Sequence, residues 1–128
     1  MKQSKIMSAY CATNILANSH ELSKDQHWDI FCLRRNLKPH VEFYNEQSEA
    51  IDQKYLKLAD ENGKVFGKDA IAYRRELEEL DNMEKDLGEI RKIRIPMIDG
   101  INSAEMEAVE DFIEFYRDEP AENAPGVC

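Results

Sequence analysis

The chain has 128 residues, of which 42% are hydrophobic and 34% are charged, and its formal net charge is −9. This length and composition suit a single soluble globular domain with one core. No segment approaches the roughly 18 consecutive apolar residues that a membrane span requires, and the surplus of acid argues against direct binding of nucleic acid.

The N-terminal segment has the apolar spacing of an amphipathic helix. Residues 3–18 carry apolar or small side chains at steps of three and four, namely Ile6, Ala9, Tyr10, Thr13 and Leu16. This spacing predicts a helix with one buried face. Polar residues interrupt the segment and no compact leucine-rich run follows, so we expect a helix of the folded protein and not a signal peptide.

A capping box begins the next and longest predicted helix. The Ser23 hydroxyl and the Gln26 carboxamide have the spacing that satisfies two free backbone amides at a helix start. An apolar stripe with a pattern close to a heptad then predicts one helix over Ser23–Asp60. We expect the packing or oligomer seam to consist of Trp28, Leu33, Leu37, Val41, Tyr44, Ile51 and Tyr55.

Pro39 lies inside this stripe. It removes the hydrogen bond to the carbonyl of Arg35 and costs about 3 kcal/mol in a helix interior. Because the stripe keeps its register across the proline, the pattern favours a kinked helix. The alternative is a helix that ends near Leu37 and a second helix that has Pro39 in its first turn.

A turn and a third helix follow. The segment Asp60–Lys64 predicts a tight turn, because its Asn-Gly pair tolerates a positive φ. A very short strand could follow at Val65–Phe66. Asp69 then caps a helix that we expect to extend to Leu87, with a glycine directly after it as the C-cap. The short connection predicts that this helix packs antiparallel to the long one.

The remaining chain predicts a minor β element and a closing helix. Apolar residues alternate with polar ones over Ile93–Met97, which is typical of a half-buried strand. Pro96 lacks a donor and therefore favours a strand at a sheet edge. Asn102 with Glu105 caps a final helix, whose apolar face we expect to extend to Tyr116.

Together these elements predict a mainly α fold. A long kinked helix is paired antiparallel with a second helix, and an N-terminal helix, a C-terminal helix and a minor β element complete it. We expect one helical domain over residues 1–119 and a flexible tail over residues 120–128. The long stripe exceeds what the second helix can cover, so its Trp28–Tyr44 half should be buried by the N-terminal helix or by another subunit in a homodimer.

The acidic charge is concentrated near the C-terminus. Residues 102–122 hold eight acids and one base, and so carry −7 of the net −9. At steps of three and four, the predicted last helix places five acids on one flank: Glu107, Glu110, Asp111, Glu114 and Asp118. This flank is either a solvated face or a binding face for a basic partner, such as a protein that normally binds DNA.

The order of the segments resembles a family of small phage and prophage proteins of unassigned function. The resemblance covers residues 25–116 and rests on LRRNLKPHVEFYNEQSEAIDQKYLKLADENGKV, YRRELEELDNMEKDL, IRKIRIPMI and SAEMEAVEDFIEF, in that order. It implies a phage or prophage origin and a bacterial cytoplasm as the setting. It brings no active site with it.

The sequence offers no constellation for catalysis. His20, His27 and His40 with Cys11 or Cys32 do not form the two closely spaced ligand pairs that zinc sites show. Cys32 with His27 or His40 is conceivable as a nucleophile and base, but its place beside the apolar seam is typical of a small core residue. Three cysteines without tight spacing favour reduced thiols in a cytoplasm.

A basic cluster on the predicted long helix is the other candidate for ligand binding. Arg34, Arg35 and Lys38 lie beside Trp28 and could bind phosphate, but acids follow directly at positions 42, 46 and 49. We therefore expect no catalytic, cofactor or metal site. The favoured function is a non-enzymatic phage accessory or assembly protein that acts through helical protein–protein contacts. The alternative is an acidic, nucleic-acid-mimicking inhibitor of a host DNA-binding or defence protein.

Overall fold

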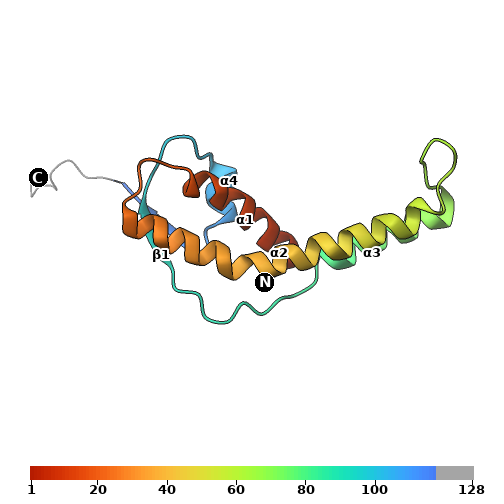
Figure 1. The fold of residues 1–128 in the computed structure, drawn as a ribbon, viewed down its shortest axis with the longest axis horizontal. Coiled ribbons are helices and arrows are strands. Elements are labelled where there is room, and N and C mark those ends of the chain that lie inside the picture. Colours follow the sequence, from red (N-terminus) through yellow and green to blue (C-terminus); the bar gives the residue numbers. More distant parts are fainter. Residues whose placement is uncertain (118–128) are drawn as a thin grey trace, which may run out of the picture.

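The computed structural model describes residues 1–117 and gives a mainly α fold with four helices and a small sheet (Figure 1). In chain order the elements are α1 (Gln3–Ala17), α2 (Lys24–Leu56), α3 (Gly67–Asp81), β1 (Ile93–Pro96), α4 (Ser103–Ala108) and β2 (Ile113–Tyr116). Two parts can be distinguished. The head consists of α1, the first half of α2, α4 and the sheet, and the hairpin consists of residues 42–81.

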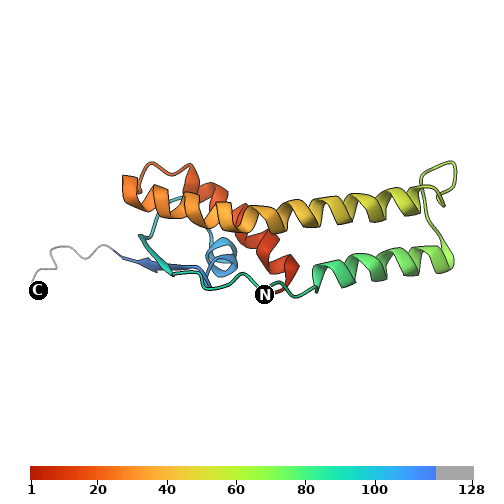
Figure 2. The same ribbon diagram turned by 60° about the horizontal axis from the view of Figure 1, so that its bottom comes forward.

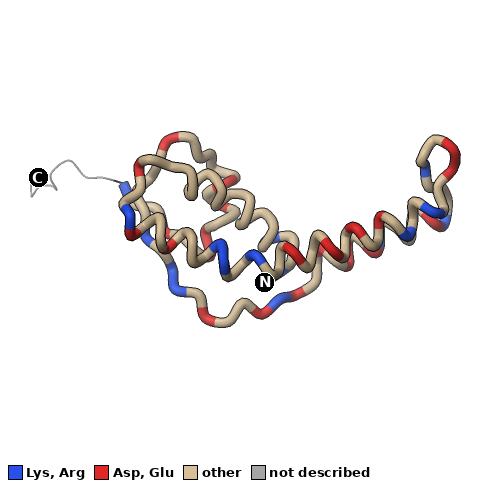
Figure 3. The backbone as a smooth tube through the Cα atoms, viewed as in Figure 1, with Lys and Arg blue, Asp and Glu red and all other residues tan. Residues whose placement is uncertain are grey.

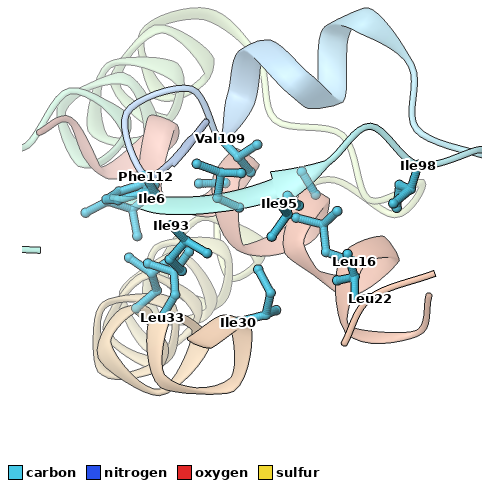
Figure 4. Close-up of a cluster of buried hydrophobic side chains, with 14 residues drawn as sticks. Ile6, Leu16, Leu22, Ile30, Leu33, Ile93, Ile95, Ile98, Val109 and Phe112 are labelled. Atoms are coloured by element: carbon cyan, nitrogen blue, oxygen red, sulfur yellow. The ribbon is translucent and has the colours of Figure 1, made fainter. Parts of the chain in front are cut away.

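The head contains the core of the molecule. α1 packs on the first half of α2, α4 packs on α1, and β1 packs on α2, so that their apolar side chains meet in one cluster (Figure 4). At about 1.5 Å per residue, α1 with 15 residues is less than half as long as α2 with 33. α1 can therefore cover only one half of the long apolar stripe. The expectation that the N-terminal helix buries this half is confirmed for Ile30, Leu33, Leu37 and Val41.

α2 begins as predicted and continues through Pro39. Both hydrogen bonds of the Ser23–Gln26 capping box are present. Helical structure on both sides of Pro39 excludes the alternative of two separate helices. The proline ring is exposed, so the carbonyl that it leaves without a helical donor is on the solvent side, where water can hydrate it. On the inner side, the buried Gln3 donates from Nε2 to the carbonyl of His40 at 2.9 Å.

α3 runs back along the second half of α2, and the antiparallel pair projects from the head (Figure 2). The turn before α3 is confirmed. The carboxylate of Asp60 accepts the backbone N–H groups of Asn62 and Lys64, both at 2.9 Å, and Gly63 has a φ of 77°. The predicted strand at Val65–Phe66 is absent from this described stretch, because its backbone finds no partner strand.

The bounds predicted for α3 are wrong at both ends. The helix begins after Phe66, not at Asp69, and it ends at Asp81, six residues before Leu87. Leu87 packs on the core of the head. A straight α3 continued to Leu87 would carry this residue past that core, and the helix therefore ends earlier. Backbone hydrogen bonds between residues 1–3 and 83–85 hold the chain in this new direction.

The closing helix is also shorter than predicted. α4 begins at the predicted Asn102–Glu105 capping box, but it ends at Ala108 and the chain continues as β2. β2 pairs in parallel with β1, with Ile93 opposite Ile113 and Phe115 opposite Ile95. Ile113 and Phe115 are branched or aromatic residues that favour a strand, and pairing satisfies the backbone of β1, which would otherwise lack a partner.

Candidate functional site

The acidic residues singled out from the sequence do not share a helix flank. Glu107 lies on α4, Glu110 and Asp111 lie in the following turn, and Glu114 lies on β2. All four are exposed. Asp118 lies outside the described residues. The predicted acidic flank is therefore wrong as a helical arrangement, because the helix stops before most of its members.

Basic side chains partly neutralise these acids. Lys5 Nζ lies 2.6 Å from Asp111 Oδ2, and Arg94 Nε lies 3.7 Å from Glu114 Oε1 on the neighbouring strand. The hydrogen bond from Lys5 to Asp111, and then the charge of that carboxylate, raise the pKa of Lys5. Exposed ion pairs of this kind add little stability, but they reduce the negative field that a basic partner would meet.

The expected seam on α2 divides into two parts. Leu33, Leu37 and Val41 are buried against the head, whereas Tyr44 and Ile51 are half-buried and Tyr55 is buried along the hairpin. Trp28 is 59% exposed, so its place in a packed seam within the chain is wrong. It precedes the buried Ile30 by two residues, which is a rotation of about 200° around the helix and places the indole on the opposite face.

Tyrosine–carboxylate hydrogen bonds join the two helices of the hairpin. Tyr44 Oη donates to Asp81 Oδ1 at 2.8 Å, near the head. Tyr73 of α3 donates to Asp52 of α2, so the direction of this bond is reversed. Each bond takes its donor from one helix and its acceptor from the other, and the pairs therefore fix the register of the hairpin.

A small polar and aromatic cluster joins the last turn of α2 to α3. Tyr55 donates to Glu76, and Lys54 Nζ lies 3.0 Å from Glu76 Oε2. The rings of Tyr55 and Tyr73 stack with their centroids 5.0 Å apart. The Tyr55 hydroxyl first, and Lys54 second, lower the pKa of Glu76, and the bond to Glu76 raises the pKa of Tyr55. Sequence reasoning placed these tyrosines on apolar faces and missed their carboxylate partners across the hairpin.

The end of the hairpin farthest from the head exposes large apolar side chains. They lie in the 57–66 connection or in the helices next to it and are Leu56 (59% exposed), Leu58 (53%), Phe66 (64%) and Ile71 (58%). These four residues are called the apolar tip below. The Asp60-centred turn between them is held by its own hydrogen bonds, so the tip is presented on a defined scaffold. Clusters of exposed apolar side chains of this kind mark protein interaction sites.

The titratable side chains of the described residues do not gather into a metal-binding group. Over residues 1–117 no group of three or more His, Cys, Asp and Glu side chains is placed to hold a metal ion. The tyrosine and carboxylate groups with shifted pKa values bond to one another, on the flanks of a projecting hairpin and away from an enclosed cleft. Cys11 and Cys32 are free thiols. Within the same described range, none of the helices has both the length and the apolar character to cross a membrane.

Comparisons of the chain with models of protein families, with curated proteins and with solved structures found no match.

Proposed function

We propose that the protein is a non-enzymatic accessory or assembly protein of a phage or prophage, which docks another protein on the apolar tip of its hairpin in a bacterial cytoplasm. The apolar tip is the observation that carries this proposal. Four large apolar side chains are more than half exposed around one ordered turn, and this turn lies at the end of the hairpin that projects from the head (Figure 2). The phage origin rests on the resemblance in the order of the segments.

The shape of the hairpin supports a docking role. A partner can reach the tip without contacting the head, because the hairpin extends beyond it (Figure 1). A convex apolar end fits an apolar groove, such as the space between helices of a partner, in which its side chains lose contact with water. At about 25 cal/mol per Å² of apolar area removed from water, such burial is a strong driving force.

The proposal is tested by capturing the partner from a bacterial host lysate and identifying it by mass spectrometry. Phe66→Ser with Ile71→Ser should abolish capture, and Lys57→Ser with Lys64→Ser, which changes exposed polar residues of the same hairpin, should retain it. An apolar interface should also hold at high salt. Recovery of the same protein by both variants would refute docking through the tip.

The alternative proposal is an acidic inhibitor that mimics nucleic acid. The exposure of Glu107 and Glu110 supports it, whereas the ion pairs of Asp111 and Glu114 weaken it. Exposed charges are screened over about 8–10 Å at physiological ionic strength. A partner held by these acids should therefore be lost as salt rises, in contrast to a partner held by the tip.

A further inference from the structure

A second exposed surface lies on the outer face of α2 in the head, away from the apolar tip. Trp28 and Phe31 are 59% and 51% exposed, and their rings stack with centroids 5.3 Å apart. Trp28 lies on the face of α2 opposite the buried Ile30 and Leu37, and Phe31 lies on the flank beside it. Two adjacent aromatic rings on a helix surface add nothing to the core of the head, so their exposure calls for another explanation.

Basic side chains lie on the Phe31 side of this aromatic pair. Arg35 lies over the ring of Phe31, with Cζ 5.8 Å from its centroid. Arg34 is fixed between the helices, because Nη1 donates to the Tyr10 carbonyl at 3.0 Å and to Thr13 Oγ1 at 2.9 Å. An open hollow between α1 and α2 is lined by Tyr10, Phe31, Arg34, Arg35 and Lys38. These five residues and Trp28 are called the aromatic–basic patch.

The charge of the patch is opposite to that of the molecule. The chain has a net charge of −9, yet α1 contains no acid, and the stretch of α2 from residue 31 to residue 41 contains three bases and no acid. Figure 3 shows α1 almost free of charged residues, whereas acids recur along the hairpin. The nearest acids along α2 are Asp29 and Glu42. The patch is therefore a local basic area on an acidic protein.

We propose that the aromatic–basic patch binds an acidic peptide segment of another protein that also carries an aromatic or aliphatic side chain. The apolar side chain of the peptide packs on Trp28 and Phe31, and its carboxylates pair with Arg35 and Lys38. Arginine over an aromatic ring offers a planar face and a carboxylate-binding fork at the same place.

A nucleic acid fits the same surface less well. Phosphates recur along a nucleic-acid strand and need a row of bases, whereas Arg34 is engaged by α1 and, as far as residues 1–117 show, only Arg35 and Lys38 of the patch are left to pair with a ligand. Beyond the patch, a strand meets a molecule with a net charge of −9, and the resulting repulsion opposes binding. A short acidic peptide can remain within the patch.

Trp28 provides the readout, because it is the single tryptophan of the chain. The full-length protein is titrated with a synthetic peptide of about nine residues, in which Glu and Asp surround one Phe, and its fluorescence is followed. We expect a blue shift that saturates with the acidic peptide and is absent with a control peptide in which Lys replaces every acid. An unchanged spectrum up to about millimolar acidic peptide would overturn the proposal.

Charge reversal locates the binding site. Arg35→Glu with Lys38→Glu should weaken binding of the acidic peptide about tenfold or more, because two attractive pairs become repulsive. The matched control, Lys57→Glu with Lys64→Glu on the hairpin, has the same change in net charge and should bind as the wild type does. If the reversal variant does not fold, Arg35→Gln with Lys38→Gln should give a smaller loss in the same direction.

The remaining outcomes identify a different occupant and would each overturn the proposal. Equal binding of the acidic peptide by the wild type and by both patch variants would place the site elsewhere. Tighter binding of an oligothymidylate than of the peptide would assign the patch to single-stranded nucleic acid. A dimer that becomes a monomer in the patch variants would assign it to a second copy of this chain.

Discussion

Leu80→Ala tests how the hairpin is held together. Of the α3 residues, all of which the structure describes, Leu80 alone is buried, with 3% of its surface exposed. Truncation of a buried leucine to alanine costs about 2–5 kcal/mol. α3 has 15 residues, a length at which an isolated helix is marginal in water, and so it depends on packing against α2. We therefore expect Leu80→Ala to free α3 while the head stays folded.

Hydrogen exchange followed by mass spectrometry measures this difference directly. Amides of α3 should exchange about 30 to 4,000 times faster in Leu80→Ala, because each 1.4 kcal/mol of opening free energy changes the rate tenfold. Amides of α1 and β1 should keep their protection, since the core around Ile6, Leu37 and Ile95 does not include Leu80. The control Ile71→Ala changes an exposed residue of the same helix and should alter stability by less than about 0.5 kcal/mol. Equal acceleration in α1, β1 and α3 would refute the division into head and hairpin.

Three further outcomes depend on individual contacts and on assembly. The bond from Tyr55 to Glu76 holds the pKa of the Glu76 carboxyl below 4.5 and the pKa of the Tyr55 phenol above 10.0. The ionised carboxylate therefore stabilises the fold above pH 4.5, and the neutral phenol stabilises it below pH 10. Circular dichroism should show the hairpin loosening as the pH falls below 4.5 or rises above 10. Gln3→Met should leave the free energy of unfolding in urea unchanged or raise it by up to about 2 kcal/mol. Within residues 1–117 the buried Oε1 of Gln3 has no hydrogen-bond partner, and the substitution loses only the bond from Nε2 to the His40 carbonyl. A large loss of stability would contradict this. Sedimentation equilibrium should show a homodimer at high micromolar concentration, and a 14.9 kDa species there would exclude it.

The starts of α2 and α4 could be predicted from the sequence because they depend on local chemistry. The capping boxes at Ser23 and Asn102 involve residues three positions apart, and both are present in the structure. The apolar stripe of α2 and the strand from Ile93 likewise follow from periodicity alone. Such signals do not require knowledge of any other part of the chain.

The errors concern places where distant segments decide the structure. The 103–116 segment has a helical start, and only the unpaired edge of β1 explains why it becomes a strand at Ile113. The end of α3 is set by the head core, on which Leu87 packs. Trp28 is an exception: its spacing from Ile30 puts it on the other face of α2, so helix geometry alone excludes it from packing within the chain.

The apolar tip is not predictable from periodicity for a physical reason. Leu58 continues the apolar stripe of α2, which packs on α3 closer to the head, and the sequence does not show where this packing ends. The end of this packing depends on the length of α3. The hairpin contains two helices, and neither of them can cover the other on all sides. Apolar residues beyond the last shared contact remain exposed.

A triple substitution separates the two proposed functions. Glu110→Gln, Asp111→Asn and Glu114→Gln remove three negative charges from exposed positions and hardly change the shape of the side chains. Because the ion pairs that they break are exposed, the fold should lose little stability. A partner docked on the apolar tip should bind this variant as it binds the wild type, since the tip lies at the far end of the hairpin (Figure 3). Loss of the partner from a variant with an unchanged circular-dichroism spectrum and melting temperature would instead mean that the acids form the interface, and docking through the tip would have to be abandoned.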